Sequence, residues 1–87
     1  MHLAYVALGA NLDDPVAQVR AAFEALRHLP QSRLTRTSSL YRTAPVGVHG
    51  QPDFINAVAQ LETDLDAAAL LDALLAIEAS FGRRRDF

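Results

Sequence analysis

The chain has 87 residues, of which 51% are apolar and 21% charged, and its formal net charge at pH 7 is −2. This length and apolar content predict one small folded domain and argue against disorder. The slight acidic excess argues against a general nucleic-acid binder, which normally carries a basic surplus. Because the chain has no cysteine, it can form neither a disulfide framework nor a cysteine-based zinc site.

The N-terminal apolar run lacks the basic leader and the cleavage site of a signal peptide. No stretch of the sequence approaches the ~20 apolar residues of a membrane-spanning helix. We therefore expect a soluble, cytoplasmic protein without a membrane partner.

The first part of the chain predicts a strand followed by a helix. Leu3–Leu8 is an uninterrupted apolar run, which is typical of a buried strand. Asp14 is a suitable helix N-cap, and Pro15 suits the first helical position because the N–H that proline lacks would have no partner there. Apolar residues then recur at helical spacing, which predicts an amphipathic helix ending near Leu29.

Two further stretches predict strands. Arg33–Thr43 is rich in Thr, Ser, Leu and Tyr, and we expect one strand with at least one face in water. In Phe54–Glu62 alternate residues point to opposite faces of the predicted strand, and one of these faces is aliphatic. The aliphatic face is expected to lie in the core. Phe54 and Asn56 share the opposite face, as a ligand-facing pair would. The expected core residues are Ile55, Ala57, Ala59 and Leu61.

The loop between these strands, residues 44–53, is too long and too rich in proline and glycine for a tight hairpin turn. A long loop between two strands of a small domain usually carries function. Polar and aromatic residues stand at its two ends, which predicts a ligand pocket there. These residues are Tyr41, Thr43, Phe54 and Asn56.

The last predicted element is a helix that follows the N-cap residue Asp66 and ends before Gly82. The element order is therefore β-α-β-β-α. Two helices on one face of an antiparallel sheet give an α+β, two-layer arrangement of ferredoxin-like kind. A further strand should follow the second helix in that arrangement, so we expect the domain to be incomplete at its C-terminus.

Residue patterns alone do not select a reaction. The turn at Gly9–Asn11 precedes a helix, as phosphate-binding turns do, but its single glycine fits an ordinary tight turn better. The arginines at 83–85 could clamp phosphate groups or form a solvated basic helix end. Glu78 borders the apolar stripe of its helix and could enter a cleft, but the pattern alone favours a carboxylate on the surface. The histidines share no ligand-like spacing, and no residue is assigned to a metal.

Four short motifs, in the same order and spacing, are similar to those of the 6-hydroxymethyl-7,8-dihydropterin pyrophosphokinase (HPPK) family of the folate pathway. They are Ser-x-Tyr-x-Thr-x-Pro-x-Gly at 39–47, Ala-Leu-Gly-Ala-Asn-Leu at 7–12, Gln-Pro-x-Phe-x-Asn at 51–56, and Ile-Glu at 77–78 followed by Gly-Arg at 82–83. The resemblance covers the N-terminal half of the family's domain. The family's Arg-x-x-Asp-[Leu/Ile]-Asp segment, which holds two Mg²⁺ ions and the nucleotide phosphates, would come after Phe87.

The resemblance implies that the β,γ-diphosphate of ATP is transferred to the hydroxymethyl oxygen of the pterin and that AMP is released. By position, Thr43, Ala44 and Val46 would line the pterin pocket, mainly through backbone groups. Phe54, which replaces a tyrosine common in the family, would stack on the pterin ring, and Asn56 would contact the polar edge of that ring.

The resemblance also implies a nucleotide site. Arg83 and Arg85 correspond to arginines that approach the triphosphate, and they are the expected catalytic residues. Glu78 joins them as an expected nucleotide-binding residue, whereas Leu75 stands where some relatives have a polar nucleotide contact. Residues 44–53 match a mobile loop that closes over the substrates.

The implied small-molecule partners are the pterin and ATP, and the Mg²⁺ ligands are expected in the missing C-terminal half. The complete protein is expected to be a monomer, whereas a truncated chain could associate through its uncovered sheet edge. We predict that the 87-residue chain alone does not catalyse the transfer. Two alternatives remain: a non-catalytic ligand-binding module of ferredoxin-like fold, and a half-domain completed by another chain or by its own copy.

Overall fold

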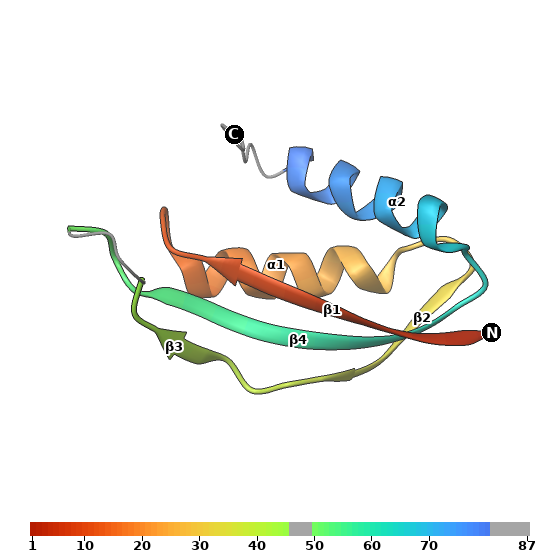
Figure 1. Ribbon diagram of the computed structural model, residues 1–87, viewed down its shortest axis with the longest axis horizontal. Coiled ribbons are helices and arrows are strands. Elements are labelled where there is room, and N and C mark those ends of the chain that lie inside the picture. The colour runs from red at the N-terminus through yellow and green to blue at the C-terminus, as the bar shows by residue number, and fades with distance from the viewer. Residues whose placement is uncertain (46–49, 81–87) are drawn as a thin grey trace.

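The computed structural model describes residues 1–45 and 50–80, and in this part of the chain two helices lie on one side of an antiparallel sheet (Figure 1). The α+β, two-layer class that the sequence predicts is confirmed. The elements are β1 (His2–Ala10), α1 (Pro15–Arg27), β2 (Ser32–Thr37), β3 (Tyr41–Thr43), β4 (Phe54–Thr63) and α2 (Ala67–Ser80).

Strand β4 is the centre of the sheet. The strand order is β1-β4-β2, and the short β3 also pairs with β4, in every case antiparallel. Helix α1 connects β1 to β2, and β4 lies between these two strands, as in ferredoxin-like folds. On its other side β1 has no neighbouring strand within the residues that the structure describes.

The strand predicted over Arg33–Thr43 is divided into β2 and β3. Ser38 lies in the gap, where its N–H donates to the carbonyl oxygen of Val58 at 2.8 Å and its Oγ accepts from the N–H of Val58 at 2.8 Å. Because a side-chain oxygen replaces a backbone acceptor, the regular ladder stops at this point. Pairing resumes in β3, which places Tyr41 opposite Asn56.

The core lies between α1 and the inner face of β4. All four core residues predicted for β4 are buried, and the exposed fractions of Ala57 and Ala59 are 1% and 0%. These small side chains leave space for the larger residues Val19 and Leu26 of α1, each 1% exposed. The alternation of β4 therefore determines which of its faces packs against the helix.

Both predicted helix N-caps are confirmed. The Oδ1 atom of Asp14 accepts a hydrogen bond from the N–H of Ala17 at 3.3 Å, and Oδ1 of Asp66 accepts one from the N–H of Ala69 at 2.8 Å. Helix α1 ends at Arg27, slightly before the predicted end near Leu29. The predicted C-terminal boundary of the second helix, at Gly82, lies outside the described residues.

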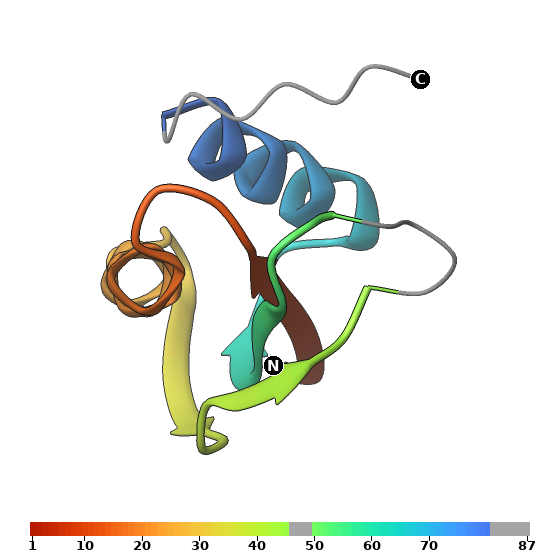
Figure 2. The same ribbon diagram turned by 90° about the vertical axis from the view of Figure 1, so that its left-hand side faces the viewer.

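Helix α2 covers the sheet only in part. Leu70, Leu74 and Ile77 pack against the core, whereas Leu71 and Leu75 are exposed. In the end-on view of Figure 2, α1 lies beside β2, and α2 lies at a distance from α1. No helix in the described part of the chain is long and apolar enough to cross a membrane.

Candidate functional site

The pairing of β3 with β4 brings together the polar and aromatic residues at the two ends of the 44–53 loop. Tyr41 is opposite Asn56, and Thr43 is opposite Phe54. Residues that are directly opposite each other in antiparallel strands project from the same face. The four side chains predicted to form a pocket therefore belong to one face at one end of the sheet.

Asn56 has a defined side-chain geometry at the centre of this group. Its Nδ2 atom donates a hydrogen bond to Oγ1 of Thr43 at 2.7 Å. On the other side of β4, Asn56 pairs with Gly9 of β1, where an added Cβ atom would lie 3.0 Å from the Oδ1 atom of Asn56. The glycine therefore leaves the space that the amide group occupies.

The turn between β1 and α1 contacts the far end of the loop. The Nδ2 atom of Asn11 lies 3.4 Å from Oε1 of Gln51 and 3.5 Å from the carbonyl oxygen of Pro52. Gln18 supports the turn from the helix, because its Nε2 atom donates to two turn carbonyl oxygens at 2.8 and 3.0 Å. The turn predicted at 9–11 is wrong in its bounds, because Gly9 and Ala10 belong to β1. The turn comprises residues 11–14 and contacts both the loop and α1.

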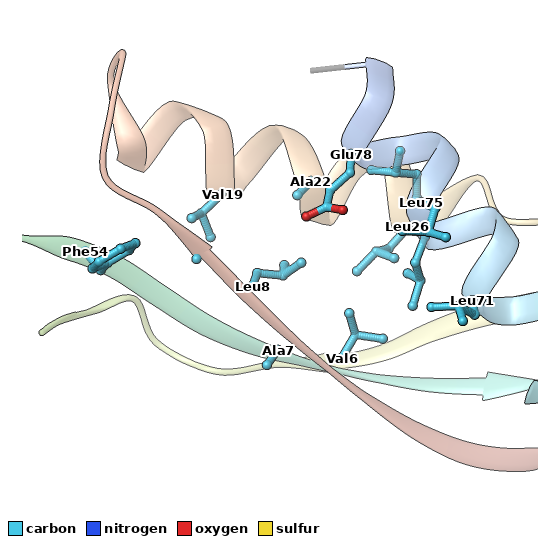
Figure 3. Close-up of a pocket in the computed structure, with 13 residues that line it drawn as sticks. Val6, Ala7, Leu8, Val19, Ala22, Leu26, Phe54, Leu71, Leu75 and Glu78 are labelled. Atoms are coloured by element: carbon cyan, nitrogen blue, oxygen red, sulfur yellow. The ribbon is translucent and has the colours of Figure 1, made fainter. Parts of the chain in front are cut away.

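An apolar cavity of about 380 Å³ lies among β1, α1 and α2 (Figure 3). Ligand pockets commonly have volumes of roughly 300–1,000 Å³. Phe54 lies at one end of the cavity and Leu71 at the other, with Leu8 of β1 between them (Figure 3). Of the four residues predicted to form a pocket, Phe54 lines this cavity, whereas Tyr41, Thr43 and Asn56 do not.

Glu78 is the one charged residue among the described residues that line this cavity. Its carboxylate projects from α2 toward the cavity (Figure 3). The residue pattern favours a surface position for Glu78 over a cleft, and this expectation is wrong, because Glu78 is one of the residues that line the cavity. Leu75 of α2 lines the same cavity, so the two helix positions that the family resemblance singled out lie together.

The remaining predicted site residues are only partly described. Ala44 is exposed and directly follows β3. Val46, Arg83 and Arg85 lie outside the described residues. The structure thus places Thr43, Ala44 and the β4 pair at one end of the sheet, and Glu78 in the cavity beside it.

The described residues offer no metal site. Within residues 1–45 and 50–80, no group of three or more His, Cys, Asp or Glu side chains could hold a metal ion. Asp64 and Asp66 form an Asp-x-Asp pair, but Asp64 contacts the N-terminal ammonium group at 3.2 Å and Asp66 caps α2. The pair also follows the C-terminal end of β4, roughly 30 Å along the strand from the candidate site.

Comparisons with known proteins identify similar sequences. A family model for 7,8-dihydro-6-hydroxymethylpterin-pyrophosphokinase (HPPK) matches residues 5–87. The chain is 48% identical over 85 residues to the 2-amino-4-hydroxy-6-hydroxymethyldihydropteridine pyrophosphokinase of Haemophilus influenzae. The aligned region covers 98% of this chain and 53% of that protein.

Two relatives with the same name give similar results. The Pseudomonas aeruginosa protein is 51% identical over 82 residues, covering 94% of this chain and 51% of the relative. The Bacillus subtilis protein is 35% identical over 85 residues, covering 98% of this chain and 51% of the relative. The chain thus spans about half the length of these three curated relatives.

Proposed function

The chain belongs to the 7,8-dihydro-6-hydroxymethylpterin-pyrophosphokinase (HPPK) family, and from this we propose that the intact protein transfers pyrophosphate from ATP to 6-hydroxymethyl-7,8-dihydropterin. The products are AMP and the pterin diphosphate, an intermediate of folate biosynthesis. The observation that carries the proposal is the Asn56 amide, which is hydrogen-bonded to Thr43 beside the half-buried ring of Phe54.

A pterin fits the chemistry of this end of the sheet. Its ring system is flat and carries N–H donors and a carbonyl acceptor on one edge. Phe54 offers an aromatic surface for stacking, and the amide of Asn56 offers both a donor and an acceptor. Thr43, Ala44 and Val46 belong to the segment that would supply backbone groups to the same ring.

The nucleotide is proposed to occupy the neighbouring region near Glu78, Arg83 and Arg85. In the transfer, the hydroxymethyl oxygen of the pterin attacks the β-phosphorus of ATP, and the bond from that phosphorus to the α,β-bridging oxygen breaks. AMP leaves with the bridging oxygen, and the hydroxyl proton passes to water. Such a reaction needs aligned substrates and charge neutralisation, which the two arginines would supply at the phosphates.

Phosphoryl-transfer enzymes generally use Mg²⁺ to neutralise the phosphate charge. The described residues do not fit a magnesium site, because no suitable cluster of carboxylates is present in that part of the chain. No step through the metal is therefore assigned to this chain. We propose that the Mg²⁺ ligands belong to the part of the domain that the relatives have beyond the region matched by this chain.

We further propose that residues 1–87 are the N-terminal portion of a single domain. The edge strand His2–Ala10 contains no proline and no Asp, Glu, Lys or Arg. Proteins normally protect a free sheet edge with such residues or cover it. A strand from the rest of the domain, paired with β1, would cover this edge, and the isolated chain is expected to be inactive.

A chimeric enzyme tests the proposal. Residues 1–87 are joined to the C-terminal part of the Haemophilus influenzae relative, and AMP formation from ATP and 6-hydroxymethyl-7,8-dihydropterin is measured. We expect the chimera to form AMP. AMP formation by the isolated chain and by an Asn56→Ala chimera should stay near background. A folded chimera that forms no AMP would contradict the proposed activity. A chimera that binds the pterin without turnover would favour a non-catalytic binding module.

A further inference from the structure

We propose that Thr43 and Gly9 are positioning residues that together fix the orientation of the Asn56 amide, with Oδ1 kept available as a hydrogen-bond acceptor for a flat heterocycle. The ligand, a pterin, is taken from the proposed function. The positioning itself rests on the geometry of three residues on three adjacent strands.

The position of Asn56 in the sheet determines which strands its amide group faces. Asn56 is on the central strand β4, with Gly9 of β1 opposite on one side and Tyr41 of β3 opposite on the other. Its Nδ2 atom donates a hydrogen bond to Oγ1 of Thr43 in β3, and its Oδ1 atom lies against Gly9 of β1. The amide group therefore lies across the strands, with its nitrogen toward β3 and its oxygen toward β1.

The side-chain amide of Asn56 has two possible orientations. A rotation of 180° about the last side-chain bond exchanges the oxygen and the nitrogen of an asparagine, and both orientations are accessible when nothing distinguishes them. Here the 2.7 Å hydrogen bond from Nδ2 to Oγ1 of Thr43 holds the amide group in place. Because a hydroxyl group can donate as well as accept, this bond alone would serve either orientation. A valine at position 43 would have the same shape as threonine but could not form this bond.

Gly9 distinguishes the two orientations of the Asn56 amide. At 3.0 Å from Oδ1, the place that a Cβ atom would occupy makes a contact tighter than nine in ten Cβ contacts in proteins, so the amide would have to shift by a few tenths of an ångström. In glycine a hydrogen atom points toward Oδ1. A C–H group is a weak hydrogen-bond donor, so an oxygen atom is a better neighbour for it than an NH₂ group, which is itself a donor. Because Gly9 does not have a positive φ, an alanine there would clash with the amide of Asn56 but would not strain its own backbone.

The fixed amide presents Oδ1 and the second Nδ2 hydrogen to a ligand. An amide that is already oriented before binding loses no rotational freedom on binding, which raises affinity without an additional contact. The chemical class selected is a planar heterocycle that carries an N–H donor beside an acceptor, with its face against Phe54. This inference extends the proposed function, because it assigns side-chain roles to Thr43 and Gly9 that act through another residue.

A double-mutant cycle tests whether Thr43 acts through Asn56. The 87-residue chain is titrated with 6-hydroxymethylpterin, and its affinity is compared for the native chain and for Thr43→Val, Thr43→Ser and Gly9→Ala. We expect about tenfold weaker binding for Thr43→Val and Gly9→Ala, and a change within about twofold for Thr43→Ser, which keeps the hydroxyl group. In the Asn56→Ala background each variant should change affinity by less than about twofold. Equal losses in both backgrounds would overturn the proposal.

A second measurement separates this inference from the proposed function. The hydrogen exchange of the Asn56 side-chain amide is followed by NMR in the chain without ligand. We expect slower exchange in the native chain and in Thr43→Ser than in Thr43→Val. If neither the native chain nor the chimera binds 6-hydroxymethylpterin, the ligand assignment fails and this exchange difference still tests the positioning. Identical exchange in all three chains would overturn the positioning role.

Discussion

The side-chain amide of Asn11 lies 3.4 Å from Oε1 of Gln51, although 40 residues separate the two in the sequence. The same nitrogen lies 3.5 Å from the carbonyl oxygen of Pro52. Exposed hydrogen bonds of this length contribute little to the free energy of unfolding. Their effect is positional, because they join the β1–α1 turn to the end of the loop immediately before Phe54.

We predict that Asn11→Ala releases the end of the loop without unfolding the domain. Amide hydrogen exchange at Gly50, Gln51 and Asp53 should become faster, while the free energy of unfolding falls by less than about 1 kcal/mol. Replacing His28, an exposed residue just after α1, is the control and should leave exchange at these positions unchanged. Unaltered exchange in Asn11→Ala would show that the contact does not hold the loop.

The contact between α1 and β4 predicts a large difference between two leucine substitutions. Leu26 is 1% exposed and packs in the same cluster as Ala59, whereas Leu71 is 56% exposed on α2. Leu26→Ala should lower the free energy of unfolding by about 2–5 kcal/mol, because it leaves a cavity in the core. Leu71→Ala should change it by less than about 0.5 kcal/mol. Urea denaturation of both variants measures the difference, and similar losses would contradict the described core.

The parts of the fold that the sequence predicts correctly are those in which local pattern and burial coincide. The alternation in β4 identifies Ile55 and Leu61 as core residues because one face of this strand packs against α1 and the other does not. The caps at Asp14 and Asp66 are also predicted, because an N-cap interaction spans only three residues. Such features need no information about distant segments.

The features that the sequence does not predict depend on partners far away in the chain. The break between β2 and β3 arises from hydrogen bonds between Ser38 and Val58, 20 residues apart, and no local turn signal marks it. The close approach of Gly9 to Asn56 is likewise a consequence of strand register. Glu78 borders the apolar stripe of α2, so helical periodicity alone does not decide whether it lies in a cavity or in solvent.

Glu78 gives a prediction about the nucleotide end of the site. It is the one charged residue among the described lining residues, and nucleotide binding is proposed beside it. In the chimera described above, Glu78→Gln keeps the shape of the side chain and removes its charge. We expect about tenfold less AMP formation, with pterin affinity unchanged. Asp72→Asn, on the exposed surface of the same helix, is the matched control and should remain active. Full activity of Glu78→Gln would exclude a role for the charge.

Within residues 1–45 and 50–80 no strand pairs with the outer edge of β1, and this edge predicts self-association of the isolated chain. Tyr5 is 67% exposed on this strand, which has no charged residue to prevent pairing with another strand. Analytical ultracentrifugation should show association that increases with concentration. Tyr5→Lys should reduce it while changing the free energy of unfolding by less than about 0.5 kcal/mol, because the side chain is exposed. The chimera, whose second part is proposed to cover β1, should be monomeric. A monomeric native chain at all concentrations would contradict this prediction.

Phe54 provides the most direct test of ring stacking in the proposed pterin site. It is half-buried at one end of the cavity and opposite Thr43, so its substitution affects both packing and binding. Phe54→Leu keeps much of the apolar volume but removes the aromatic face, and Phe54→Tyr keeps the face. We expect about tenfold weaker binding of 6-hydroxymethylpterin by Phe54→Leu and a change within about twofold for Phe54→Tyr. Thermal unfolding of each variant identifies any loss that comes from the fold. If the leucine variant is folded and binds the pterin as tightly as the native chain, the ring of Phe54 does not stack on the ligand.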